Sequence, residues 1–369
     1  MLKIKIFYFI VLIFLFYFSY LLKNFQLLLV SICFFILFGM FFKKINKNIL
    51  LVFFSFLFTI TIVELGLFFN NDKKIINIKS EKNFTKHVKV KKTYLGTQPL
   101  SGVQHHKIVK NGINVIDSYY TINENNFRQT PQVNNLAKEK TLNFFGGSKT
   151  FGWGLNDDET LPYLIQAYFP KWKINNYAIS GYGVHQMLAQ ITKEPDLIKD
   201  INILVTYIAH VPRANCKRDF TFGTPRYVLN KKNELIRSGY CNFGFFNKLP
   251  LPSIFGKIIK RSEIKILLDK IYFRKSLYNK EDVELFLTII KEINKIIINK
   301  KNFFFVGYIS QKTETDNYII KKLKENKIKI IDLSLDENNK KYKIPLDGHP
   351  TKQANVERSL MIWENLKKN

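Results

Sequence analysis

Cysteine is scarce in this sequence: three residues in 369 are too few for a disulfide-dense scaffold or a cysteine-rich zinc module. Acidic residues are also few, 29 against 57 lysines and arginines, which leaves a formal net charge of +28. Helix-turn-helix, zinc-finger and aromatic RNA-binding patterns are absent, so this charge does not predict a nucleic-acid partner. Such a charge favours anionic partners such as phosphate-bearing lipid or acidic glycan, but lysine is spread along the whole sequence, which a general coding bias explains better. A hydrophobic content of 46% excludes the disordered and fibrous classes.

Hydrophobic residues are concentrated at the N-terminus. Three apolar runs, at 6–22, 27–42 and 49–69, approach or reach the roughly 20 helical residues that a bilayer core requires. They predict a transmembrane region over 1–70, with the lipid bilayer as a partner. The lysines before the first run and between the last two place the N-terminus in the cytoplasm. Three crossings then place everything after about residue 70 in the periplasm, or outside the cell, of a bacterium.

Two cysteines, Cys216 and Cys241, fall in this outer part of the chain. An oxidising compartment permits a disulfide between them. Their separation in the sequence does not fix their distance in space, so the paired and the free states both stay open.

The soluble part changes character at residue 141. Residues 71–140 form a lysine-rich connector with a β-rich lead-in, whereas apolar strands and helices alternate over 141–369. This alternation predicts an α/β domain in which helices cover both faces of a parallel sheet. Residues 214–262 are expected to be an irregular insertion. The expected strands are 141–145, 174–178, 201–209, 303–309 and 328–333, and the expected helices are 161–169, 184–191, 282–299, 313–325 and 352–366.

The end of the first strand carries the sequence GGSKTFG, which contains Ser148. Ligands of such sheets bind at the carboxyl ends of the strands. Two glycines before a serine at a strand-to-helix turn can expose its hydroxyl and aim backbone N–H groups at one point. An activated serine and its oxyanion require this arrangement. The same residues are also typical of an ordinary turn.

Three further segments carry candidate residues at turns. NYAISGYG contains Gly181, a possible backbone donor, and YIAHVPR contains His210 at the end of a strand. LDGHP contains Asp347 and His349 just before the last helix. A neutral imidazole accepts a proton from a serine hydroxyl when a carboxylate fixes its tautomer. Each segment alone is equally compatible with a plain turn, a strand cap or a surface pair.

Together these segments resemble the SGNH (GDSL-like) hydrolase superfamily over about residues 141–366. The sequence FFGGSKTFGWGLNDDETLP is similar to the first block of that family, and YYTI and FR resemble the lead-in of its membrane-anchored members. The resemblance implies a flavodoxin-like, three-layer α/β fold and no metal or other cofactor. The roles that it implies are nucleophile for Ser148, base for His349, orienting acid for Asp347, and oxyanion donors for the N–H groups of Ser148 and Gly181.

The sequence departs from the family pattern in four places, two of which flank the serine: Gly147 replaces the usual Asp, and Lys149 replaces a common aromatic. The usual Gly-x-Asn of the third block is absent, which leaves His210 or Asn215 as a third oxyanion donor. The acid stands two residues before His349 rather than the commoner three. The alternatives to Asp347 are Asp332 and Asp336.

The expected function is that of an extracytoplasmic serine esterase. Its expected substrate is an O-acylated, for example O-acetylated, envelope glycan or lipid-linked sugar. One alternative is an O-acetyltransferase of cell-surface polysaccharide, which needs a membrane acyl-transfer partner. Another is an inactive glycan-binding or assembly protein, favoured by Lys149 beside the serine and by the missing Asn. His105 and His106 are interpreted as a solvated loop pair rather than a metal site.

Overall fold

A computed structural model describes residues 29, 32–33, 47–76, 84–132, 139–241, 279–336 and 338–368. The chain divides into two compact units. One contains Met1–Glu81 and Gly244–Lys275, and the other contains Lys82–Phe243 and Ser276–Asn369. The second unit contains all the candidate site residues.

A five-stranded parallel sheet forms the centre of the second unit, in the order β12-β11-β8-β6-β7. Each strand matches one of the expected apolar runs closely. Every residue of β8 is buried, as in a central strand covered on both faces. The predicted α/β fold with a parallel sheet is confirmed. The strands are β6 (Thr141–Gly146), β7 (Lys173–Asn176), β8 (Ile201–Tyr207), β11 (Phe303–Ile309) and β12 (Lys329–Asp332).

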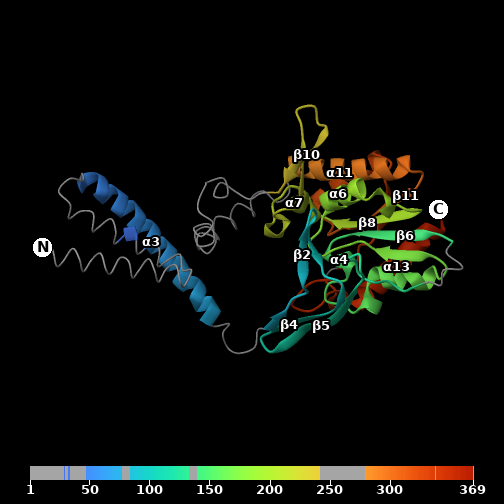
Figure 1. The fold of residues 1–369 in the computed structure, drawn as a ribbon, viewed down its shortest axis with the longest axis horizontal. Coiled ribbons are helices and arrows are strands. Elements are labelled where there is room, and N and C mark those ends of the chain that lie inside the picture. The colour runs from blue at the N-terminus through green and yellow to red at the C-terminus, as the bar shows by residue number, and fades with distance from the viewer. Residues whose placement is uncertain are drawn as a thin grey trace. The chain divides into compact units, whose positions relative to one another are not determined.

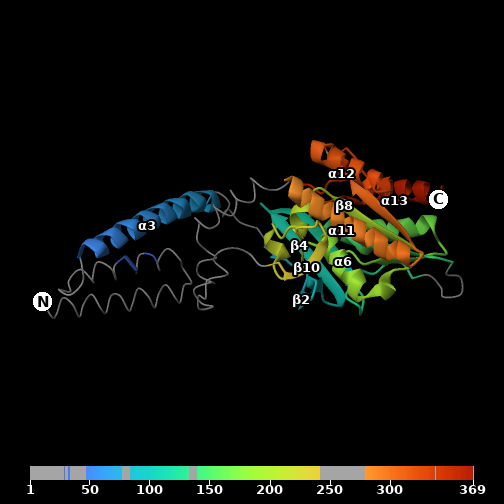
Figure 2. The same ribbon diagram turned by 90° about the horizontal axis from the view of Figure 1, so that it is seen from above.

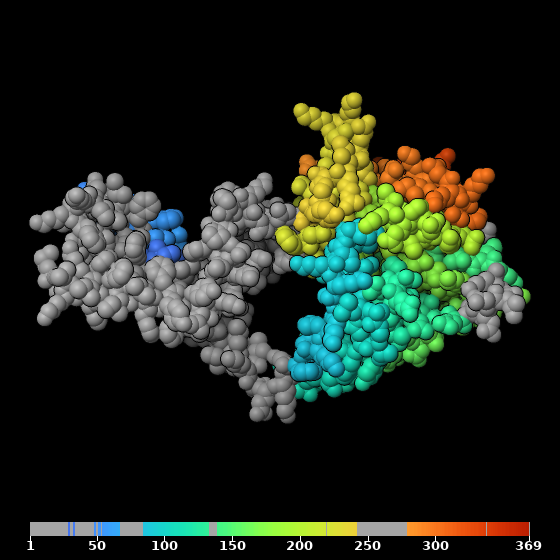
Figure 3. Space-filling model, in the orientation of Figure 1, coloured from blue at the N-terminus to red at the C-terminus, as the bar shows by residue number. Residues whose placement is uncertain are grey.

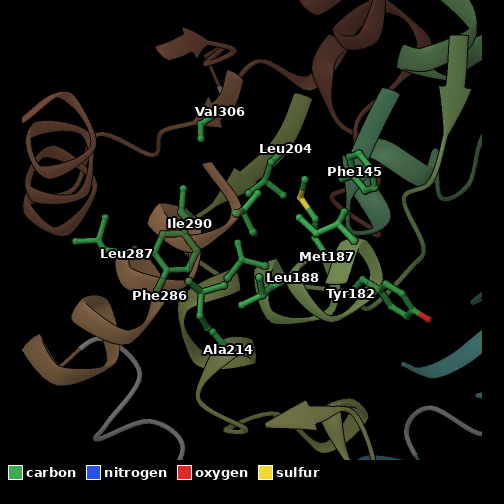
Figure 4. Close-up of a cluster of buried hydrophobic side chains, with 14 of the residues drawn as sticks. Phe145, Tyr182, Met187, Leu188, Leu204, Ala214, Phe286, Leu287, Ile290 and Val306 are labelled. Atoms are coloured by element: carbon green, nitrogen blue, oxygen red, sulfur yellow. The ribbon is translucent and has the colours of Figure 1, made fainter. Parts of the chain in front are cut away.

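Helices cover both faces of this sheet (Figures 1 and 2). The larger core packs Met187 and Leu188 against Phe286 and Ile290 and against Leu204 of β8 (Figure 4). Burying each such large apolar side chain stabilises the fold by about 1.5–3 kcal/mol. One face carries α6 (Val184–Lys193), α11 (Lys280–Asn299) and α12 (Glu314–Glu325), and the other carries α5 (Leu161–Leu164) and α13 (Lys352–Lys367).

The start of α13 fixes the end of the loop that carries His349. The Thr351 side chain accepts a hydrogen bond from the Ala354 N–H at 3.3 Å, which satisfies one of the free donors of the first turn. Asn355 lies in the same turn, and its side-chain amide donates to the Glu159 carbonyl at 3.0 Å. The loop before α13 is therefore tied to the segment that follows the serine turn.

Residues 84–130, which we call the lead-in, form two antiparallel sheets, β1-β4-β5 and β2-β3. Figure 1 shows β2, β4 and β5 at the end of the central sheet where α4 is labelled. In Figure 3 the lead-in packs directly against the α/β domain. Arg128 bridges Ile122 of β5 to Asn176 of β7. The strands are β1 (Phe84–Lys86), β2 (Val90–Thr93), β3 (Gly96–Pro99), β4 (Gly102–Lys110) and β5 (Ile113–Ile122).

The predicted irregular insertion contains a regular hairpin, which corrects the prediction for its first part. Strands β9 (Pro225–Leu229) and β10 (Leu235–Tyr240) pair antiparallel and project from the surface (Figure 3). The Asn230 side chain closes their turn by accepting from two backbone N–H groups. A disulfide joins Cys216 to Cys241, so the paired state is the one present. Residues 242–262 of the predicted insertion lie outside the described residues.

The first unit contributes α3 (Lys47–Ile76) to the described residues. No helix in the described ranges combines the length and the hydrophobicity that a membrane crossing requires. The predicted crossing at 49–69 falls within α3 and is not supported. The other two, at 6–22 and 27–42, lie almost wholly outside the described residues. Membrane anchoring stays a prediction.

Candidate active site

The turn between β6 and α4 (Ser148–Phe151) has no room for side chains before Ser148. A Cβ atom on Gly146 would lie 2.7 Å from the Val205 carbonyl oxygen, and one on Gly147 would lie 2.8 Å from the Tyr182 carbonyl oxygen. Both distances are shorter than atoms tolerate, so only glycine fits these positions. Ser148 begins α4, and its N–H has no acceptor within that helix.

Ser148, His349 and Asp347 form a chain of hydrogen bonds. Ser148 Oγ lies 2.8 Å from His349 Nε2, although 201 residues separate the two positions. His349 Nδ1 lies 2.5 Å from Asp347 Oδ1, and the backbone N–H of His349 donates to the same oxygen at 3.2 Å. Ile344 closes the loop beneath them by accepting from Gly348 N at 2.9 Å and donating to His349 O at 2.8 Å. The structure therefore brings together the three residues that the sequence predicts as a triad.

Burial and hydrogen bonding act in opposite directions on Asp347. Burial raises the pKa of its carboxyl group, but the hydrogen bonds that His349 donates to it outweigh burial, so the pKa of Asp347 is lowered. Asp347 is therefore an anion at neutral pH. An anionic acceptor favours the tautomer of His349 that carries its proton on Nδ1. Nε2 is then left to accept the proton of Ser148.

The two alternative acids are engaged elsewhere. Asp332 accepts from the N–H of Ser334 at 2.9 Å, and Asp336 accepts from the N–H of Asn338 at 3.0 Å. Neither of them contacts His349, whose ring bonds to Asp347. The geometry selects Asp347 among the three aspartates.

The loop that carries Gly181 lies beside the serine turn. The Ile179 N–H donates to the Gly146 carbonyl at 3.2 Å, and Arg213 Nη1 donates to the Tyr182 carbonyl at 2.7 Å. Among the described residues, no protein acceptor bonds to the N–H of Ser148 or of Gly181. Both groups are thus available as donors to an oxyanion.

The third predicted donor, His210, is fully buried at the start of α7 (His210–Ala214). Its Nδ1 lies 2.9 Å from Thr206 Oγ1, and its Nε2 points at Gly147. Burial, together with the charge of Arg213, lowers the pKa of His210 well below its usual value, so the ring is neutral. The side chain of His210 has no exposed surface from which to reach a substrate oxygen. Its burial therefore does not support the predicted oxyanion role, which stays a prediction.

The alternative to His210 is also committed to the fold. The Asn215 side-chain amide donates to the Val211 carbonyl at 2.9 Å and to the Asp282 carbonyl at 3.0 Å. The bond to Val211 lies within the end of α7, and the bond to Asp282 ties α7 to α11. Lys149, the cation beside the serine, lies with its Nζ 4.3 Å above the centre of the Tyr207 ring.

Sequence reasoning missed Arg128 as a residue of the site. It is 1% exposed and donates to the carbonyls of Phe151, Gly152 and Leu155. Its Nε also donates to the Asp157 carboxylate at 2.9 Å. One lead-in side chain therefore fixes the backbone immediately after Ser148. Carbonyl groups carry no sequence signal, so nothing in the sequence points to these partners.

The prediction of a solvated loop pair at His105 and His106 is wrong in two respects, the loop and the exposure of His106. Both lie on β4, and His106 is fully buried with its Nδ1 2.6 Å from Tyr120 Oη. Its ring packs edge-on against Trp153. Burial lowers the pKa of His106 to about 4. Side chains of successive strand residues point to opposite faces of the sheet, so two adjacent histidines on a strand are expected to differ in burial.

In the described part of the chain no group of three or more His, Cys, Asp or Glu side chains is placed to hold a metal ion. A larger and a smaller cavity, both lined by described residues, adjoin the lead-in. The larger, about 950 Å³, has a lining rich in Asn and Gln that contains none of Ser148, Asp347 and His349. The smaller, about 280 Å³, is lined in part by Trp153 and Ser180.

The sequence matches no family model and none of the curated proteins. Three similar solved structures are a member of the lipolytic G-D-S-L family from Veillonella parvula, an acetyl xylan esterase from Butyrivibrio proteoclasticus and the esterase EstA from Pseudoalteromonas sp.. Their identities to this chain are 12%, 13% and 9%, and their TM-scores are 0.36, 0.32 and 0.33. The alignments cover 62%, 65% and 62% of this chain and 99%, 65% and 97% of those chains.

The Veillonella parvula protein is named for the G-D-S-L family, which is the family that the motifs of this sequence resemble. All three TM-scores are below 0.5. The chemistry of the site is therefore inferred from its own geometry alone.

Proposed function

We propose that this protein is a serine-dependent ester hydrolase. The observation that supports this most directly is the hydrogen-bonded chain from Ser148 through His349 to Asp347. A hydroxyl becomes a nucleophile when an adjacent base takes its proton, and the base acts when a third group orients it. Both conditions are met at hydrogen-bonding distance.

The reaction has two stages at this site. Ser148 Oγ attacks the acyl carbon while His349 Nε2 takes the hydroxyl proton, and the carbonyl oxygen becomes an oxyanion. The bond to the alcohol then breaks as His349 gives the proton to the leaving oxygen. Water attacks the acyl-serine in the same way, and the free acid leaves. The carboxylate of Asp347 stabilises the imidazolium that forms in both stages.

The oxyanion is held by backbone donors. The N–H groups of Ser148 and Gly181 have no protein acceptor among the described residues, and Arg213 holds the Gly181 loop through the Tyr182 carbonyl. In this mechanism they bind the developing negative charge. Losing one donor of this kind typically costs about 10²–10³ in rate.

We propose that the substrate is an O-acylated envelope glycan or lipid-linked sugar outside the cytoplasm. The Cys216–Cys241 disulfide supports an oxidising compartment. The substrate class, the membrane anchor at 1–70 and a membrane acyl-transfer partner rest on the sequence.

Hydrolysis of a chromogenic acetyl ester by the full-length chain, purified in detergent, tests the proposal. Ser148→Ala is expected to lower kcat by roughly 10⁴-fold or more. Ser101→Ala, at an exposed serine of the lead-in, is the matched control and is expected to keep wild-type turnover. Equal turnover in all three proteins would overturn the proposal. Transfer of the acyl group to an added sugar in excess of acid release would favour the acetyltransferase alternative.

A further inference from the structure

A cavity of about 280 Å³ lies where the lead-in meets the α/β domain. The β2-β3 hairpin and the segment before it form one wall, and the residues just after Ser148 and just before Gly181 form the other. Both walls are mostly apolar, and the described lining contains no lysine, arginine or carboxylate. The lining residues are His87, Val88, Val90, Thr97 and Pro99 of the lead-in, and Phe151, Trp153, Ile179 and Ser180 of the α/β domain.

Two of these residues adjoin the reacting groups. The N–H of Trp153 donates to the Ser148 carbonyl at 3.0 Å, and the centre of its indole ring lies 5.9 Å from that of His349. Ser180 directly precedes Gly181, the proposed oxyanion donor. Trp153 therefore lines the cavity and also contacts Ser148 and His349, and Ser180 is one residue from the proposed oxyanion donor.

The lining discriminates between the two halves of an ester substrate. A sugar would place hydroxyl groups against Val88 and Pro99, which offer them no hydrogen-bond partner, and unpaired buried polar groups are costly. An apolar acyl chain meets no such cost, and each buried methylene improves binding about fourfold. The acyl half therefore fits this cavity better than the alcohol half.

The volume of the cavity favours an acyl group larger than acetyl. An apolar cavity of about 150 Å³ holds a molecule the size of benzene. An acetyl group is smaller than benzene and would leave most of about 280 Å³ unfilled. Acyl groups of several carbons fill it better.

We propose that the lead-in is half of the acyl-binding site, and that the enzyme prefers esters of apolar acyl groups longer than acetyl. This inference rests on the proposed hydrolase function and adds the class of acyl group to it. The lead-in is then part of the substrate site rather than a spacer between the membrane and the domain.

The test compares acetate and hexanoate esters of p-nitrophenol with the full-length chain in detergent. Wild type is expected to show a higher kcat/KM for hexanoate than for acetate. Val90→Phe narrows the cavity from the hairpin side and is expected to lower the hexanoate-to-acetate ratio of kcat/KM by roughly tenfold. Val103→Phe is the same substitution at an exposed valine of β4 outside the cavity, and it is expected to keep the wild-type ratio.

The failures of the two proposals are distinguishable. Hydrolysis of both esters with acetate preferred, or a ratio that Val90→Phe leaves unchanged, would overturn the acyl site while the hydrolase function stands. An equal fall of the ratio in Val90→Phe and Val103→Phe would also overturn it. No hydrolysis of either ester would overturn the hydrolase function and this inference with it.

Discussion

The α/β domain and the lead-in meet at one site, but their side chains lie there under different conditions. The domain contributes His349 and Asp347 from a turn, and their side chains are 26% and 12% exposed. The lead-in contributes Arg128, whose side chain is fully buried and bonds only to protein groups. His106 and Tyr120 of the lead-in are equally inaccessible.

This difference separates the chemistry of the site from its support. A group that transfers protons must face the substrate, so it lies on a loop at the sheet edge and stays partly open. A group that positions the nucleophile works best when packing and hydrogen bonds lock its rotamer. If this division is right, substitutions in the two regions will change different quantities.

The largest effect is expected from a substitution that removes a catalytic charge and leaves the fold intact. Asp347→Asn removes the charge that stabilises the imidazolium, and kcat for an acetyl ester is expected to fall by about 10³–10⁴-fold. The free energy of unfolding in urea is expected to change little. Asp332→Asn, at an exposed aspartate that the sequence alone left as an alternative, is the matched control and should keep kcat. A larger loss in the Asp332 variant would reverse the assignment.

Removing the hydrogen bonds of Arg128 is expected to lower the free energy of unfolding more than it changes the chemistry. Arg128→Met removes one donor from the Asp157 carboxylate and one from each of three carbonyls, and the free energy of unfolding is expected to fall by about 3–5 kcal/mol. Urea denaturation measures this loss. Arg237→Met, at an exposed arginine of β10, should cost less than about 1 kcal/mol. Similar losses in the two variants would show that Arg128 does not support the turn.

The Cys216–Cys241 disulfide separates stability from catalysis, because it stabilises the folded chain and contacts none of the reacting groups. Cys216→Ser opens a loop of 25 residues, and the free energy of unfolding is expected to fall by about 3 kcal/mol. Below the unfolding midpoint kcat should stay at the wild-type value. A large loss of kcat in the folded variant would mean that the hairpin region belongs to the site.

The smallest effect is expected on the pH dependence of stability, through His106. Burial lowers the folded-state pKa of His106 to about 4, from an ordinary value of 6.5. Between these two values the unfolded chain binds the proton and the folded chain does not, so stability falls as the pH falls from 6.5 towards 4. His106→Gln is expected to reduce the loss of unfolding free energy between pH 7 and pH 5 by about 1–2 kcal/mol. Urea denaturation at both pH values measures it, and an unchanged loss would contradict the shift.

The sequence predicts the domain well because its signals are local. A continuous apolar run specifies a buried strand such as β8, and Gly147 before Ser148 marks a turn with no space for a side chain. The support around Arg128 depends on backbone carbonyls brought together by tertiary packing, and no residue type encodes them. The burial of His106 had a local signal, the alternation of a strand, which the charge and pairing of His105-His106 obscured.

Mass-spectrometric mapping of a fluorophosphonate adduct on the full-length protein tests the central claim most directly. The reagent reports which side chain is nucleophilic, whatever the natural substrate. A single adduct on Ser148, lost in His349→Ala, is the predicted result. An adduct on any other residue, or one on Ser148 that forms as fast without the imidazole, would contradict the account.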